Sequence, residues 1–138
     1  MVAHGQNCGD CPGPWVKKET CAADLRAYGV NASSPMQSRA LLYGFSPGSC
    51  SGVNPSHLTE VEEDIANFLL IRGKYAYLGN GWTGCSHFYQ YPAEQFNADY
   101  GEPLGLATET AKGVFTREWS KATIQMDCNT YSPKITFK

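Results

Sequence analysis

The chain has 138 residues, of which 42% are hydrophobic and 12% aromatic, and it carries a net charge of −2. A chain of this length forms a single domain, and this apolar fraction is sufficient for a hydrophobic core. Its eleven basic residues are scattered along the sequence, which argues against a nucleic-acid partner. Apolar runs such as Phe68–Ile71 are far shorter than the roughly 18 residues of a membrane span, so we expect neither a span nor a signal peptide.

Residues 1–20 are rich in glycine, proline and cysteine and show no apolar periodicity, so they are predicted to form a loop. Cys8 and Cys11 form a C-x-x-C pair there, and with His4 and Cys21 they offer the residue types that bind zinc. The spacing to Cys21 fits no standard zinc knuckle, and the pair does not stand between a strand and a helix as in thioredoxin-like redox sites. We therefore expect no metal and no cofactor.

Six cysteines lie in segments rich in turn-forming residues: Cys8, Cys11, Cys21, Cys50, Cys85 and Cys128. An even number of cysteines in such settings predicts up to three disulfides and an extracellular or secretory location, because disulfides persist in oxidising compartments. The sequence leaves their pairing open. A glycosylation acceptor, Asn31-Ala32-Ser33, points to the same compartment.

Two helices are predicted in the first half of the chain. Cys21–Tyr28 contains good helix formers and is followed by Gly29, a residue suited to the position just after a helix end. The sequence S-P-M-Q at residues 34–37 combines an N-cap serine, a proline at the first helical position and a glutamine three residues after the cap. This capping box predicts a helix over residues 35–43.

A third helix is predicted from about residue 57 to residue 72. Thr59 and Glu62 form a second capping box, and the apolar residues that follow recur at the helical spacing. The short aromatic segment Tyr75–Leu78 predicts a strand, so residues 21–78 hold the helices and one strand. Residues 79–113 then form a predicted loop.

Residues 114–128 alternate between apolar and polar side chains, which predicts a β-hairpin. Its two strands run over residues 114–119 and 123–128. The period of two places four large apolar side chains on one buried face: Phe115, Trp119, Ile124 and Met126. A two-stranded hairpin is marginally stable alone in water, so this one must dock on another part of the chain or on a partner.

The segment before the hairpin reads D-Y-G-E-P-L-G over Asp99–Gly105, and its first strand reads F-T-R-E-W over Phe115–Trp119. These motifs, within Phe68–Cys128, resemble the C-terminal end of glycoside-hydrolase-like (β/α)8 barrels. The resemblance implies an α/β fold: a partial (β/α)8-type segment with two or three helices, a short parallel strand and a C-terminal β-hairpin. A complete barrel takes about 250 residues. Residues 1–138 would therefore be a single domain forming the C-terminal part of a larger barrel.

A cluster of aromatic, amide and imidazole side chains follows the predicted helix 57–72: Tyr77, Asn80, Trp82, His87 and Tyr89, with Tyr91 close by. Flat aromatic faces with polar groups between them suit sugar rings, and in a barrel the loop after a strand lies on the face that carries the site. Carbohydrate is therefore the expected ligand. The alternative is that these residues pack the core or a loop, since buried Tyr and Trp often keep one polar end wet.

The sequence offers no evident pair of catalytic carboxylates, which glycosidases require on either side of the scissile bond. Glu60, Glu62, Glu63 and Asp64 open the third helix, where the helix dipole favours negative charge. Asp99 lies in a turn and is expected to bond its own backbone. We therefore expect a secreted, glycoside-hydrolase-like domain that contacts carbohydrate, with catalytic residues unknown. The alternative is a non-catalytic extracellular structural or assembly protein that pairs with itself or with a larger complex.

Overall fold

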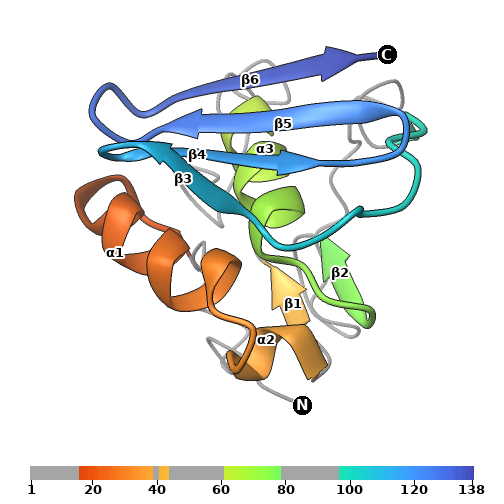
Figure 1. Ribbon diagram of the computed structural model, residues 1–138, viewed down its shortest axis with the longest axis horizontal. Coiled ribbons are helices and arrows are strands. Elements are labelled where there is room, and N and C mark those ends of the chain that lie inside the picture. The colour runs from red at the N-terminus through yellow and green to blue at the C-terminus, as the bar shows by residue number, and fades with distance from the viewer. Residues whose placement is uncertain (1–15, 39–40, 44–60, 79–96) are drawn as a thin grey trace, which may run out of the picture.

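The computed structural model describes residues 16–38, 41–43, 61–78 and 97–138. An antiparallel sheet of four strands, in the order β3-β4-β5-β6, forms one layer. Two helices, α1 (Cys21–Leu25) and α3 (Val61–Ile71), lie beneath it (Figure 1). The other elements in chain order are η1 (Lys18–Thr20), the π-helical turn η2 (Arg26–Val30), α2 (Pro35–Ser38), β1 (Leu41–Tyr43), β2 (Ala76–Leu78), β3 (Thr108–Ala111), β4 (Val114–Glu118), β5 (Ala122–Asp127) and β6 (Ser132–Phe137).

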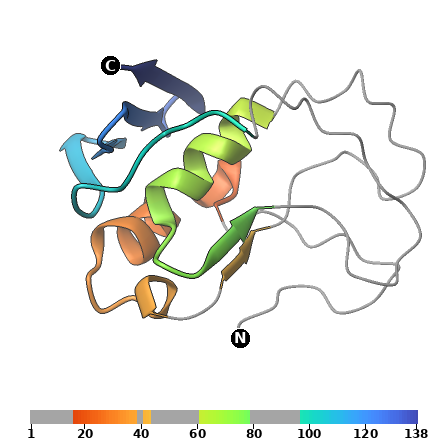
Figure 2. The same ribbon diagram turned by 90° about the vertical axis from the view of Figure 1, so that its right-hand side faces the viewer.

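The core lies between the sheet and α3. Burial alternates along β4 and β5, and Phe115, Trp119, Ile124 and Met126 are each at most 1% exposed, which confirms the predicted buried face. The ladder places Phe115 opposite Met126. α3 is apolar on nearly all sides, and six of its residues belong to the same core cluster as this face of the sheet: Ile65, Ala66, Phe68, Leu69, Leu70 and Ile71. Figure 2 shows α3 between the antiparallel sheet and the β1–β2 pair. The hairpin therefore docks on the chain itself.

The C-terminal end of α3 is capped by side chains from other elements. The last four carbonyl groups of a helix have no partner within it. Arg117, which β4 presents to the core, donates from Nη1 to the carbonyl oxygens of Leu69 at 3.0 Å and Leu70 at 3.3 Å. Gln37 of α2 donates from Nε2 to the carbonyl of Ile71 at 3.0 Å. A buried cation at this end also suits the negative pole of the helix dipole.

A disulfide joins Cys21, the first residue of α1, to Cys128, directly after β5. It spans 107 residues of sequence and holds the helical layer against the sheet. The predicted disulfide chemistry is thus confirmed for this pair. The other four predicted disulfide cysteines, Cys8, Cys11, Cys50 and Cys85, lie outside the described residues.

The predicted fold class is wrong. A partial (β/α)8-type segment requires parallel strands alternating with helices, whereas the described residues are dominated by the antiparallel sheet β3-β4-β5-β6. The predicted two-stranded hairpin exists, but it is the centre of this sheet. β3 pairs with β4 inside the region predicted as the loop 79–113, and β6 adds a further strand beyond residue 128. Within the described ranges, parallel pairing is confined to the three-residue strands β1 and β2.

Helix boundaries also differ from the prediction in two places. The helix predicted over residues 35–43 ends at Ser38, and Leu41–Tyr43 forms β1, because pairing with β2 overrides the local helix signal. The helix beginning at Cys21 does not stop at Gly29 but continues through η2. Gly29 is buried there, and a Cβ would lie 3.1 Å from the carbonyl oxygen of Leu70. Glycine is thus present for close packing rather than to end a helix.

Candidate functional site

The predicted carbohydrate-binding residues lie almost entirely outside the described part of the chain. Asn80, Trp82, His87 and Tyr89 fall in residues 79–96, as does Tyr91. Tyr77 is the central residue of β2, where it pairs with Leu42, but only its backbone is described. The structure therefore does not test whether these residues gather, and their role in sugar binding stays a prediction.

The described residues contain a different candidate, at the end of the sheet that holds the β4–β5 turn. Tyr100 and Phe137 stack there, with ring centroids 5.5 Å apart and an angle of 23° between the ring planes. Phe137 ends β6 and is 54% exposed. Figure 1 shows the C-terminus, the β4–β5 turn and the segment before β3 at this end of the sheet. We call this site the aromatic corner; it comprises Asp99, Tyr100, Glu118, Lys121, Phe137 and Lys138.

The D-Y-G-E-P-L-G motif builds one side of the aromatic corner by running along the hairpin end. The backbone N–H of Lys121 donates to the carbonyl of Tyr100 at 3.3 Å, and that of Leu104 donates to the carbonyl of Glu118 at 2.9 Å. Between these contacts Gly101 adopts a φ of 76°, and a Cβ there would lie 2.1 Å from the Ser120 hydroxyl. Only glycine therefore fits this turn. The motif positions Tyr100 over the end of β6.

Asp99 begins the same turn. Its Oδ1 accepts the backbone N–H of Gly101 at 3.0 Å, which confirms the prediction that this carboxylate bonds its own backbone. Its Oδ2 forms an ion pair with Lys121. The Lys121 ammonium and the Gly101 N–H lower the pKa of Asp99 below its ordinary value, so this exposed carboxylate is ionised at neutral pH.

A second ion pair lies on the outer face of the sheet at this end, because Glu118 pairs with Thr123 and Thr123 with Thr136, whereas Phe137 shares the inner face with its partner Ala122. Lys138 Nζ is 2.8 Å from Glu118 Oε2 and also donates to the carbonyl of Trp119 at 2.7 Å. The hydroxyl of Thr123 donates to both oxygens of Glu118, at 3.0 and 2.9 Å. Hydrogen bonds from Lys138 and then Thr123 lower the pKa of Glu118 below its ordinary value. The Glu118–Lys138 ion pair thus lies on the opposite face of the sheet from Phe137, and Asp99–Lys121 is the ion pair next to Tyr100.

Tyr100 supplies a neutral hydroxyl at the aromatic corner. It is partly buried, and burial raises its pKa above the ordinary value, with a smaller contribution from the negative charge of Glu62. The phenol consequently remains protonated throughout the physiological range. A neutral aromatic pair can receive an apolar ring face, and the Asp99–Lys121 ion pair next to Tyr100 can hydrogen-bond the edge of that ring.

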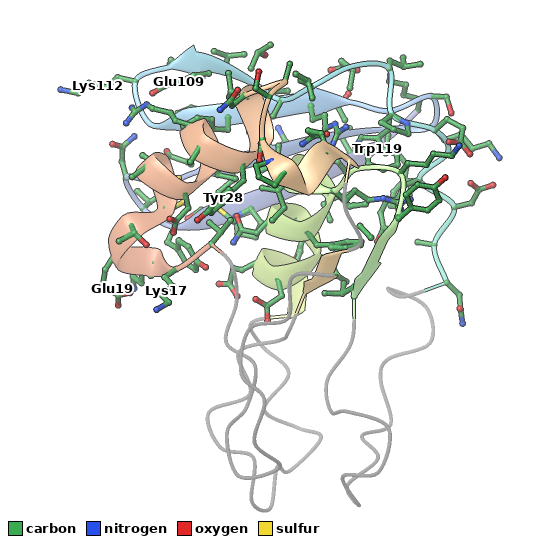
Figure 3. The ribbon with its side chains drawn as sticks, turned by 90° about the horizontal axis from the view of Figure 1, so that it is seen from below. Lys17, Glu19, Tyr28, Glu109, Lys112 and Trp119 are labelled. Carbon is green, nitrogen blue, oxygen red and sulfur yellow. A yellow bond between two sulfur atoms is a disulfide. The ribbon has the colours of Figure 1, made fainter. Side chains whose placement is uncertain are left out.

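The opposite end of the sheet has a purely structural ion pair. Glu109 of β3 accepts hydrogen bonds from Arg26 at 2.6 and 2.8 Å and from the backbone N–H of Gly113 at 2.8 Å. These contacts, led by Arg26, lower the pKa of Glu109 to about 2. Figure 3 shows Glu109 and Lys112 at the far end of the sheet from Trp119, and thus away from the aromatic corner. This ion pair ties the η2 segment to β3.

Sequence reasoning missed both rings of the aromatic corner. Tyr100 was contained in the motif that carried the family resemblance, but nothing in its local sequence indicated a contact with Phe137, 37 positions further along. The available signal was the alternation of Pro133, Ile135 and Phe137, which marks one face of a further strand. That strand would have placed Phe137 at the end of the buried face.

Two further absences concern the described residues 16–38, 41–43, 61–78 and 97–138 alone. No group of three or more histidine, cysteine, aspartate or glutamate side chains in these ranges could hold a metal ion. No helix in these ranges has the length and apolar character to cross a bilayer.

Comparison with known proteins adds no assignment: a scan against protein-family models finds no match, and a search of curated proteins finds no relative. The resemblance to glycoside-hydrolase-like proteins therefore stays untested.

Proposed function

We propose that this protein is a non-catalytic extracellular domain that binds carbohydrate at the aromatic corner. The observation that carries the proposal is the half-exposed ring of Phe137, stacked on Tyr100, with the Asp99–Lys121 ion pair next to Tyr100. Sugar rings present C–H groups on their faces and hydroxyls on their edges. An aromatic face with charged hydrogen-bonding groups around it offers a partner to each.

Binding without hydrolysis follows from the state of the carboxylates at the aromatic corner. A glycosidase needs one carboxyl group whose pKa is raised, so that it can donate a proton to the leaving group. The pKa values of Asp99 and Glu118 are instead lowered, and each carboxylate is occupied by a lysine. Neither is suited to act as a general acid at neutral pH. The Cys21–Cys128 disulfide supports an oxidising location.

The alternative function, assembly through exposed sheet edges, is less well supported. Proline and lysine on an edge strand and irregular register are features that discourage the addition of further strands. β6 contains Pro133 and Lys134, and β3 is only four residues long with a shift in register between Glu109 and Ala111. Both edges of the described sheet therefore resist pairing with a second copy. We propose carbohydrate binding alone.

The test is binding of the purified, oxidised chain to a panel of soluble oligosaccharides, measured by calorimetry and by amide chemical shifts. For a glycan that binds, Phe137→Ala should lower the affinity about five-fold, the equivalent of about 1 kcal/mol for a lost stacking partner. Phe137→Tyr, which keeps the ring, should retain binding. Amides of the aromatic corner should shift on titration.

The matched control is Tyr75→Ala, because Tyr75 is another exposed aromatic residue, at 51%, and lies in the turn between α3 and β2. It should leave the affinity unchanged. Equal losses in Phe137→Ala and Tyr75→Ala, or no binding across the panel, would contradict the proposed site. Hydrolysis of a bound glycan that disappears in Glu118→Gln would contradict the non-catalytic assignment.

A further inference from the structure

The glycosylation sequon Asn31-Ala32-Ser33 lies in an exposed turn between η2 and α2. All three of its residues are exposed. The turn is closed by the backbone N–H of Ser34, which donates to the carbonyl of Asn31 at 3.0 Å. The sequon is therefore presented on the surface of the folded protein rather than buried in it.

The side-chain amide of Asn31 is held with its nitrogen available. Its Oδ1 accepts the backbone N–H of Ser33 at 2.9 Å, which fixes the amide plane. Among the described residues, Asn31 Nδ2 makes no hydrogen bond. A substituent on this nitrogen would therefore leave every described contact of the turn in place.

The turn is anchored on both sides to rigid structure. After it, Gln37 of α2 donates from Nε2 to the carbonyls of Tyr28 at 2.9 Å and Ile71 at 3.0 Å. Before it, the carbonyl of Gly29 accepts the backbone N–H of Ala107 at 3.2 Å. A bulky group on Asn31 would project from a fixed position and would not need the neighbouring backbone to open.

We propose that Asn31 carries an N-linked glycan when the chain passes through a eukaryotic secretory pathway. In this transfer a bond forms between Asn31 Nδ2 and the anomeric carbon of an oligosaccharide carried on a lipid pyrophosphate. The bond from that carbon to the pyrophosphate breaks, the lipid pyrophosphate leaves, and the amide nitrogen loses one proton. The hydroxyl of Ser33 completes the sequon that the transferase recognises.

The modified turn lies apart from the aromatic corner. In Figure 1 the turn that leads into α2 is at the bottom of the molecule and β6 is at the top, with α3 and the sheet between them. A glycan on Asn31 would cover the helical side of the protein and leave the exposed ring of Phe137 open. The modification site is thus independent of the proposed binding function.

The experiment is secretion of the full chain from eukaryotic cells behind a cleavable leader, followed by peptide mapping before and after enzymatic release of N-glycans. We expect glycan on the Asn31 peptide of the original chain and of Ser33→Thr, which keeps the sequon. Ser33→Ala should lose it, although the backbone N–H that bonds Asn31 is retained. The Cys21–Cys128 bridge, mapped in the same digest, confirms folding of each variant. An unmodified Asn31 in the secreted, bridged protein, or a glycan that persists in Ser33→Ala, would overturn the proposal.

Discussion

Replacement of Arg117 by methionine is the sharpest test of how the sheet and α3 are held together. Arg117 is 4% exposed, and its Nη1 also donates to the carbonyl of Arg72 at 2.8 Å, beyond its two bonds to the end of α3. Its Nε donates to the carbonyl of Gly105 at 2.8 Å, and its guanidinium lies 5.5 Å from the centre of the Trp119 ring. One side chain thus joins β4, α3 and the segment before β3.

The expected loss follows from these contacts. Nη1 carries two hydrogens that its three carbonyl acceptors must share, so with Nε three N–H donors are engaged. A hydrogen bond to a charged group contributes about 1.5–3 kcal/mol, so these three are large together before costs are subtracted. The cost is desolvation of the cation: burial, and then the charge of Arg72, lower the pKa of Arg117 to about 10. Methionine avoids that cost and fills the aliphatic volume, but it leaves the carbonyls without a donor. We expect Arg117→Met to lower the free energy of unfolding by about 3–5 kcal/mol, in the range for removing one member of a buried charged network.

The assay is urea unfolding of the oxidised protein, with Arg117→Lys and Thr116→Ser as companions. Lysine keeps the charge but cannot bond both the end of α3 and the Gly105 carbonyl. Arg117→Lys should therefore lose less stability than Arg117→Met and more than Thr116→Ser. Thr116 lies on the outer face of β4, and its replacement by serine should change stability by no more than about 0.5 kcal/mol. A loss below about 1 kcal/mol for Arg117→Met would refute the assignment of Arg117 as the cap of α3.

Three further predictions concern the sheet and its attachments. Replacing Cys21 and Cys128 together by serine should cost about 2–5 kcal/mol by urea unfolding, because the bridge closes a long loop; an unchanged midpoint would contradict this. Arg26 holds the pKa of Glu109 near 2, so the stability from this carboxylate should be complete above its ordinary pKa of 4.5 and lost as the pH falls toward 2. Glu109→Gln should flatten that part of a stability–pH profile, and profiles of equal slope would count against the ion pair. Trp119→Ala should destabilise by about 3–5 kcal/mol in thermal or urea unfolding, as for other emptied aromatic core sites, and a loss under about 1 kcal/mol would mean that the hairpin end is undocked.

The central hairpin could be predicted because its apolar, buried residues recur at every second position of the sequence. β4 and β5 lie where the alternation of Phe115, Trp119, Ile124 and Met126 placed them. β3 could not be found this way, since all four of its residues are exposed and carry no alternation. β6 has Pro133 and Lys134 near its start, which are poor strand residues, and it exists because β5 offers a full ladder. Pairing, rather than local pattern, defines both outer strands.

The failed part of the helix prediction has a similar cause. The capping box at residues 34–37 does begin a helix, but nothing local indicates that Leu41–Tyr43 will find β2 more than 30 residues later. The aromatic corner depends in the same way on distant pairing, since β6 must lie against β5 before Phe137 can meet Tyr100. A local sequence pattern carries no information on such a contact.

The covalent ring closed by Cys21 and Cys128 leaves β6 outside it. β3, β4, β5 and α3 all lie within the ring, whereas β6 is attached to the described structure through its ladder with β5, its packing on α3 and the stacking of Phe137 on Tyr100. Amide hydrogens of β6 should therefore exchange through a local opening that leaves the ring folded, at a lower free energy than those of β5. Each opening would separate Phe137 from Tyr100 and Lys138 from Glu118, so the aromatic corner would be lost. A glycan that contacts the side chains of both Tyr100 and Phe137 would slow this exchange, and the added protection of the β6 amides would report the free energy of glycan binding.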